Sequence, residues 1–235
     1  MPVSKIAFEG WLYQIGDGTI PSLSALSRAS GLSKATFSLQ RTKNAVQPNT
    51  IMRIARGYGL HPLQELARFD GFQGIWPAPE PPKDLLLTVI STVELVKEVL
   101  RRGGDIADPQ VQDLHPPTDA LIRWADRVGP EIDRKTAADS IGMRPENLSR
   151  DLNSRRLSFP NILKYADIAG THPALGLCAA GWLEPSELPG VTSLSESMRA
   201  CSGRQIWNEL EASKRYVRAT LESIITEDDM HRKLG

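Results

Sequence analysis

The chain has 235 residues, of which 40% are hydrophobic and 24% charged, and its 28 basic residues are balanced by 28 acidic ones. A net charge of zero argues against a polycation that coats DNA without regard to sequence, although it leaves room for local basic faces. The length is sufficient for two small domains, each with a modest hydrophobic core.

The first third of the chain has the pattern of a small helical domain. Apolar residues recur at helical spacing over residues 4–15, and Gly16 ends this segment. Further helices are expected at residues 23–30, 34–42, 50–58 and 62–69. Gly31 lies at a tight turn between two of them, where a positive φ is favoured. Ser33 is expected to cap the helix that follows, and Phe37 to point to the core.

A connector and a long helix are expected next. Residues 76–82 are rich in proline and cannot continue a helix. We expect Asp84 to cap one long helix that runs to about Arg102, with a broad apolar stripe. The stripe is too wide to face water, so it should pack on the neighbouring domain, on the C-terminal helix or on a second protomer. Residues 105–117 are expected to form an irregular crossover.

The chain then repeats its first domain. Residues 26–39 align with residues 137–150, so that Gly31 matches Gly142 and Phe37 matches Leu148. The alignment continues downstream, and upstream it holds with a loop that is two residues shorter in the second copy. Helices of this copy are expected at residues 118–128, 134–141, 145–153, 161–169 and 173–181. A repeat of this length indicates two copies of one small domain. A turn-rich connector, 183–194, and a long helix from Arg204 to about Ile225 follow.

Each copy resembles the lambda-repressor-like (Cro/repressor, XRE-type) helix-turn-helix DNA-binding domain, a compact bundle of about five helices. The resembling residues are 26–33, Ser38, 48–55 and Gly59 in the first copy, and 137–143, 148–149 and 162–170 in the second. The resemblance implies an all-α fold with two such domains joined by a long helix and followed by a C-terminal long helix. The predicted segments are 1–75, 76–116, 117–184 and 185–235.

The resemblance also implies that residues 34–42 and 145–153 are recognition helices, which enter the major groove of double-stranded DNA. Lys34 would then contact guanine, and Ala35 or Thr36 a thymine methyl group. In the second copy Asn147 would pair with adenine, Arg150 with guanine, and Glu146 would accept from cytosine. Pro145 stands where the family often has a polar residue. The residues on and just before these two helices that are expected to bind DNA are Ser33, Lys34, Ala35, Thr36, Ser38, Arg144, Glu146, Asn147, Ser149 and Arg150.

Basic residues flank both predicted recognition helices. From Arg28 to Arg56 there are six Lys or Arg and no Asp or Glu, whereas Asp139, Glu146 and Asp151 dilute the second copy. This asymmetry is typical of a DNA-binding protein whose remainder is soluble. The residues expected to contact phosphates are Arg41, Lys43, Asn44, Arg53, Arg155, Arg156 and Asn161.

The predicted function is a sequence-specific transcription regulator, most simply a repressor that blocks polymerase by occupying an operator. A phage or prophage immunity repressor, a host regulator and the DNA-binding half of a toxin–antitoxin pair fit the residues equally well. Two unlike recognition helices suggest two unlike half-sites, read by a monomer that acts as a pseudo-dimer or by a homodimer formed through the long helices. The alternative is that only the first copy binds DNA, while the second copy and the apolar helix bind a protein partner.

The residues do not indicate an enzyme. There is no catalytic triad with supporting glycine motifs and no phosphate-cradling loop. Two cysteines, Cys178 and Cys201, and four scattered histidines have no metal-ligand spacing, so neither a metal nor another cofactor is expected. No small-molecule ligand is evident. The most apolar run, residues 85–96, is too short to span a bilayer. We therefore expect a cytoplasmic, nucleoid-associated protein.

Overall fold

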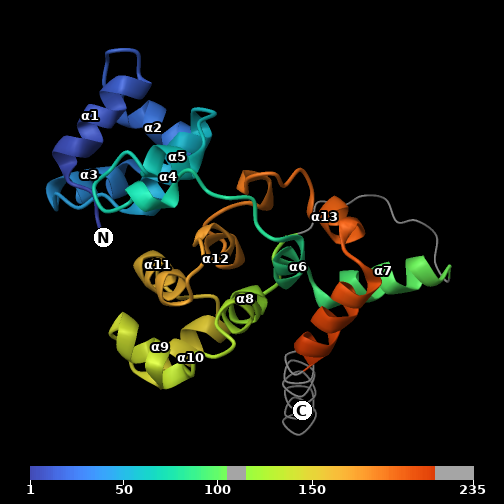
Figure 1. Ribbon diagram of the computed structural model, residues 1–235. Coiled ribbons are helices and arrows are strands. Elements are labelled where there is room, and N and C mark those ends of the chain that lie inside the picture. Colours follow the sequence, from blue (N-terminus) through green and yellow to red (C-terminus); the bar gives the residue numbers. More distant parts are fainter. Residues whose placement is uncertain (105–114, 215–235) are drawn as a thin grey trace, which may run out of the picture. The chain divides into compact units, whose positions relative to one another are not determined.

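The computed structural model describes residues 1–104 and 115–214, and every regular element within these ranges is a helix (Figure 1). One isolated antiparallel bridge, between Val3 and Val46, is the only β-pairing in the described part. The predicted all-α class is therefore confirmed. Within the same ranges, no helix combines the length and the apolar character that crossing a bilayer requires.

The chain divides into two compact units. Unit 1 comprises residues 1–79 and 172–174, and unit 2 comprises residues 80–171 and those from 175 onward. The helices of unit 1 are α1 (Lys5–Ile15), α2 (Leu23–Ser30), α3 (Lys34–Thr42), α4 (Pro48–Gly57), α5 (Pro62–Leu66) and the 3-10 helix η1 (Gln73–Ile75). Helix α4 is central, because it packs on both α2 and α5.

Local sequence signals account for the helix ends in unit 1. The side chains of Ser4, Ser22 and Ser33 each accept a hydrogen bond from the backbone amide three residues on, at 3.1–3.2 Å. Gly31 ends α2 in the left-handed conformation, with φ at 65°. The predicted bounds of α2 and α3, the cap at Ser33 and the turn at Gly31 are thus confirmed. Phe37 is buried, as expected.

Unit 2 contains two groups of helices. The first group is α6 (Lys83–Leu86), η2 (Leu87–Val89), α7 (Thr92–Gly103), η3 (Pro185–Glu187), α13 (Leu194–Ala200) and a helical stretch over residues 203–214. The second is α8 (Ala120–Val128), α9 (Arg134–Ile141), α10 (Pro145–Asn153), α11 (Phe159–Ile168) and α12 (Ala174–Ala179, of which Leu175 onward belongs to this unit). Helix α8 contacts η2 and so joins the two groups.

Helices α9 to α11 have the same lengths as α2 to α4. Helix α2 begins at residue 23 and α9 at 134, α3 at 34 and α10 at 145, α4 at 48 and α11 at 159, so each begins 111 residues after its counterpart. Three aligned pairs have positive φ in both copies: Gly31 and Gly142, Gly59 and Gly170, and Asn44 and Arg155. The backbone therefore takes the same local conformations in the two copies.

The predicted single long helix from Asp84 to Arg102 is wrong. The chain leaves η2 in an extended conformation at Ile90, and Ser91 then caps a new helix, α7. Leu86, Val89 and Ile90 are almost fully buried. Leu87 and Thr88 are buried as well, so five consecutive side chains, 86–90, lie in the core of unit 2. One continuous helix that is buried on one face would have turned some of these five side chains away from the core.

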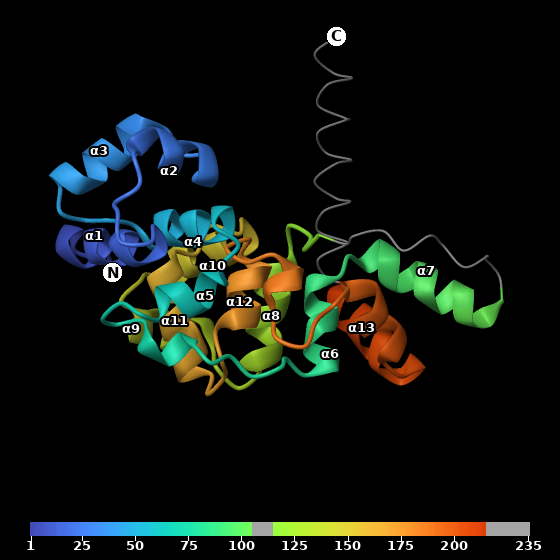
Figure 2. The ribbon, with the colours of Figure 1, turned by 90° about the horizontal axis from the view of Figure 1, so that it is seen from above.

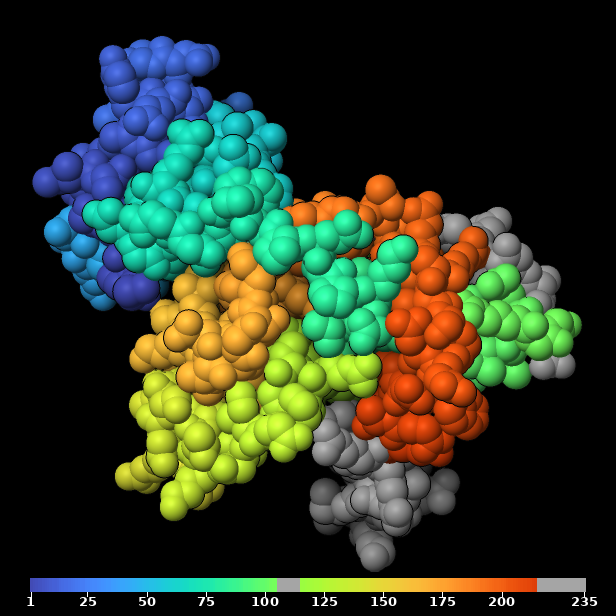
Figure 3. Space-filling model, viewed as in Figure 1, coloured from blue at the N-terminus to red at the C-terminus, as the bar shows by residue number. Residues whose placement is uncertain are grey.

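Part of the predicted apolar stripe is not covered within the chain. Val93 on α7 is 63% exposed, and Val96 and Leu100 are exposed as well. In the space-filling view the residues of α7, drawn in green, lie at the surface of unit 2 (Figure 3). In unit 1, Ile6 belongs to the apolar pattern predicted over residues 4–15, but it is 83% exposed. The predicted crossover falls largely on residues 105–114, which lie outside the described residues. Of the predicted C-terminal helix, residues 204–214 are helical, and the rest falls on residues 215–235, also outside the described residues.

Candidate nucleic-acid interface

Helix α3 presents an accessible outer face. Figure 2 shows α2 and α3 forming an edge of unit 1. Lys34, Ala35 and Ser38 are exposed on α3, and Thr36 is half-buried. The Ser33 hydroxyl lies 2.9 Å from that of Thr36. The five predicted residues from Ser33 to Ser38 other than the buried Phe37 are therefore brought together around the capped start of the helix, where a ligand from solvent can reach them.

Gln40 is a positioning residue that the sequence reasoning missed. Its Oε1 accepts hydrogen bonds from the Gln47 amide at 3.0 Å and from the buried Thr50 hydroxyl at 2.9 Å. These bonds fix the end of α3 against the start of α4. Because its partners lie seven and ten residues further along the chain, no local pattern could have identified Gln40.

Unit 1 carries excess positive charge. Residues 1–79 contain eight Lys or Arg and four Asp or Glu. Two of the acids are paired internally: Glu9 with Arg41, and the buried Glu65 with Arg68 at 3.1 Å. Lys34 and Lys43 are exposed and have no ion pair with any residue in the described part of the chain. The surface around α3 is therefore electropositive.

Three of the predicted phosphate-contacting residues in unit 1 have partners within the protein. The guanidinium of Arg41 donates to Glu9. Arg53 donates from Nε to the carbonyl of Ser30 at 2.9 Å, at the end of α2. Asn44, in the left-handed conformation, accepts from the Lys5 amide at 2.7 Å. These side chains stabilise the unit, which leaves Lys43 as the predicted phosphate ligand with no described partner.

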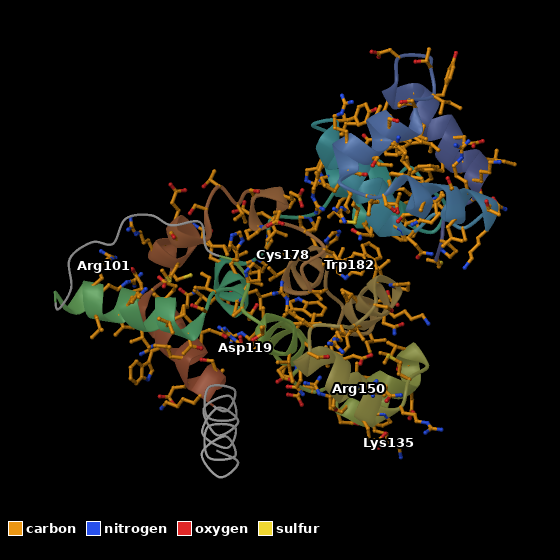
Figure 4. The ribbon with its side chains drawn as sticks, turned by 180° about the vertical axis from the view of Figure 1, so that it is seen from behind. Arg101, Asp119, Lys135, Arg150, Cys178 and Trp182 are labelled. Atoms are coloured by element: carbon orange, nitrogen blue, oxygen red, sulfur yellow. The ribbon has the colours of Figure 1, made fainter. Side chains whose placement is uncertain are left out.

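The corresponding helix in unit 2, α10, also faces solvent at its start. Arg144, Glu146 and Arg150 are exposed, while Asn147 and Ser149 are half-buried. Arg144 occupies the position before the helix, but its side chain forms no capping bond. Figure 4 shows Arg150 and Lys135 in the same yellow-green part of unit 2, on α10 and α9.

Charge is nearly balanced around α10. Residues 115–183 contain nine Lys or Arg and eight Asp or Glu. Arg150 lies 3.3 Å from the carboxylate of Asp151. Asp133 caps α9, and the hydrogen bonds from Thr136 hold the pKa of its carboxyl below the usual value, so it is ionised at neutral pH. The α10 surface therefore attracts a polyanion less than the α3 surface does.

The remaining predicted residues of unit 2 differ in accessibility. Arg155 has φ at 57°, and its Nη1 donates to the carbonyl of Pro116 at 2.9 Å. Asn161 donates to the sulfur of Met143 at 3.0 Å. Arg156, in contrast, is exposed. Of the two arginines, Arg156 is the one whose charge is more available to an external ligand.

A cavity of about 500 Å³ lies between the end of α8 and the start of α9. It is lined by Ile122, Asp126, Gly129, Pro130, Ile132, Asp133 and Arg134. Arg134 is bonded to Asp126 and to the hydroxyl of Tyr165, so its charge is satisfied inside the unit. Among the described residues, no cluster of three His, Cys, Asp or Glu could hold a metal ion.

Comparisons with known proteins returned no significant match, whether to a protein-family model, to a curated protein or to a solved structure.

Proposed function

We propose that this protein is a sequence-specific, double-stranded DNA-binding transcription regulator of the repressor type, built on two lambda-repressor-like five-helix domains. The observation that carries the proposal is the α3 surface: a capped recognition helix with an accessible outer face in a unit with eight basic and four acidic residues. Such a helix fits the major groove, where the base edges differ in their donors and acceptors.

In this proposal the α3 surface binds a DNA duplex through non-covalent contacts. The exposed ammonium of Lys34 would donate to guanine O6 or N7, and Ser38 would donate to or accept from a base edge. Lys43, just after α3, would meet a phosphate and contribute to affinity without reading sequence. A protein bound in this way represses transcription by excluding polymerase from the operator.

The second copy supports two versions of the proposal. The equal helix lengths and matching left-handed turns of α9 to α11 favour a second recognition helix, α10, that reads an unlike half-site. The balanced charge around α10 favours the other version, in which unit 1 supplies the DNA contacts and the second copy binds a protein partner. A homodimer through α7 is compatible with either version.

The proposal is tested by selecting duplexes from a random pool with the full chain and measuring their affinity by mobility shift. The double variant Lys34→Ala/Lys43→Ala should lose about tenfold or more in affinity, because it removes a base contact worth about 1–3 kcal/mol and, in addition, a phosphate contact. The control Lys97→Ala, on α7, should bind like the wild type. Failure to enrich any duplex would refute the proposed function.

A second double variant, Asn147→Ala/Arg150→Ala, separates the two versions. If α10 reads a half-site, affinity for the selected duplex should fall, and the bases protected by unit 1 should remain protected. If affinity and protection are unchanged, the version with a single DNA-binding copy holds.

A further inference from the structure

The outer strip of α3 is short-chained and uncharged. It consists of Ala35, Ser38, Leu39 and Thr42, which lie on one face of the helix and are all exposed. Leu39 is 55% exposed, so most of its side chain is available to a ligand from solvent. This strip lies between Lys34, at the first position of α3, and Lys43, just after its last.

The aligned positions of α10 have a different chemistry. Ala35 corresponds to Glu146, Leu39 to Arg150 and Thr42 to Asn153, whereas Ser38 corresponds to Ser149. Both helices have nine residues and the same preceding turn, so the helical framework does not require an apolar residue at position 39. The methyl-rich strip is a property of α3 alone.

A duplex offers one apolar group in its major groove, the 5-methyl group of thymine. The exposed side chain of Leu39, between Lys34 at the base edges and Lys43 at the phosphate backbone, complements a thymine methyl group in the groove. We propose that α3 recognises thymine through Leu39, so that the half-site bound by unit 1 carries an A·T pair where Leu39 meets the groove. This inference rests on the proposed function and adds a specificity-determining residue to it.

The expected effect is modest and measurable. Burying one methyl group against Leu39 should strengthen binding about fourfold, which corresponds to about 0.8 kcal/mol. Deoxyuridine has the same hydrogen-bonding edge as thymidine and lacks only this methyl group. Replacing thymidine by deoxyuridine therefore isolates the contact.

The experiment uses the full chain and a duplex selected from a random pool. The duplex is resynthesised with deoxyuridine at one thymidine position at a time, and each version is bound by wild type and by Leu39→Ala. At one or two positions the wild type should lose about fourfold in affinity. The variant should bind the thymidine duplex more weakly and should show no loss with deoxyuridine at those positions.

Two controls keep the outcome interpretable. Leu39→Ala places a good helix former at an exposed site, so its thermal unfolding should match that of the wild type. Val93→Ala removes another exposed apolar side chain, on α7, and should keep the full deoxyuridine effect. A wild type that is insensitive to deoxyuridine everywhere, or a variant that keeps the same sensitivity, would overturn the inference while leaving DNA binding itself intact. If no duplex is enriched at all, both proposals fail together.

Discussion

Arg123 and Glu209 form an ion pair of 2.8 Å inside unit 2, with each residue only 3% exposed. The guanidinium also donates to the carbonyls of Ile90 at 2.7 Å and Leu87 at 2.8 Å. The Ile90 carbonyl lies at the break between η2 and α7, where the backbone leaves the helical conformation, and Leu87 is the first residue of η2. Arg123, on α8, thus satisfies backbone carbonyls of the interrupted helix and also links this segment to the helical stretch over residues 203–214.

Replacing Arg123 by Met should destabilise the protein strongly. The variant leaves the Glu209 carboxylate and the Ile90 carbonyl buried without their partner, while the Leu87 carbonyl keeps the Ile90 amide at 3.2 Å. Breaking such a buried pair costs about 3–5 kcal/mol. The free energy of unfolding in urea measures the loss. As a control, Arg127→Met removes a half-exposed pair with Asp84 at 3.2 Å and should cost about 0–1 kcal/mol. Equal losses in the two variants would contradict the role assigned to Arg123.

Two glycine substitutions should have opposite signs. Gly142 has φ at 76° and no atom within 4 Å of an added Cβ, so Gly142→Ala tests backbone strain alone and should destabilise by about 1–2 kcal/mol. Gly10 lies within α1, also with free space around it, and Gly10→Ala should stabilise by about 0.5–1 kcal/mol. Thermal unfolding compares them. A destabilised Gly10→Ala would show that this surface of α1 is covered in solution.

Glu98 should make stability depend on pH in the acid range. Hydrogen bonds from Arg101 and then Arg102, at 2.7–2.8 Å, hold the pKa of this buried carboxyl below its usual value of 4.5, although burial opposes them. A folded-state pKa below the unfolded one means that the stabilisation is present above about pH 4.5 and is lost as pH falls through the folded pKa.

The variant Glu98→Gln should therefore unfold more easily than the wild type at pH 7, by about 1.5–3 kcal/mol for the lost charged hydrogen bonds. The difference should shrink as the pH is lowered from 4.5 towards 2, which urea unfolding at each pH records. Glu94→Gln, whose partner Lys97 is exposed, should change stability by only about 0.5 kcal/mol. If the difference in unfolding free energy between Glu98→Gln and the wild type stayed constant with pH, the titration of Glu98 would not explain the pH dependence.

Substitutions of Lys43 and Arg41 should have different effects, the first on DNA affinity and the second on the stability of the protein. Lys43→Ala should lower the slope of log affinity against log salt by about one and leave unfolding unchanged, because the side chain has no described partner. Arg41→Ala should lower stability, because it leaves Glu9 unpaired. Binding at several salt concentrations, together with thermal unfolding, checks both. An unchanged slope in Lys43→Ala would place this residue outside the phosphate contacts.

The sequence by itself determined the local structure of both copies. The bounds of α2, α3, α9 and α10 follow from apolar spacing, and the turns at Gly31 and Gly142 follow from the freedom of glycine at positive φ. Burial of Phe37 and Leu148 follows from the same spacing. Apolar spacing and the positions of glycines involve only residues a few positions apart, so they can be recognised in the amino-acid sequence alone.

The tertiary structure decided which polar side chains remain available and where the predicted long helix breaks. Arg41 pairs with a residue 32 positions away, and Arg155 donates to a carbonyl 39 positions away. Arg123 reaches back 33 and 36 positions to the carbonyls at the break. Helical spacing describes one segment at a time, whereas the pairing of a buried charge depends on which distant segment packs against it.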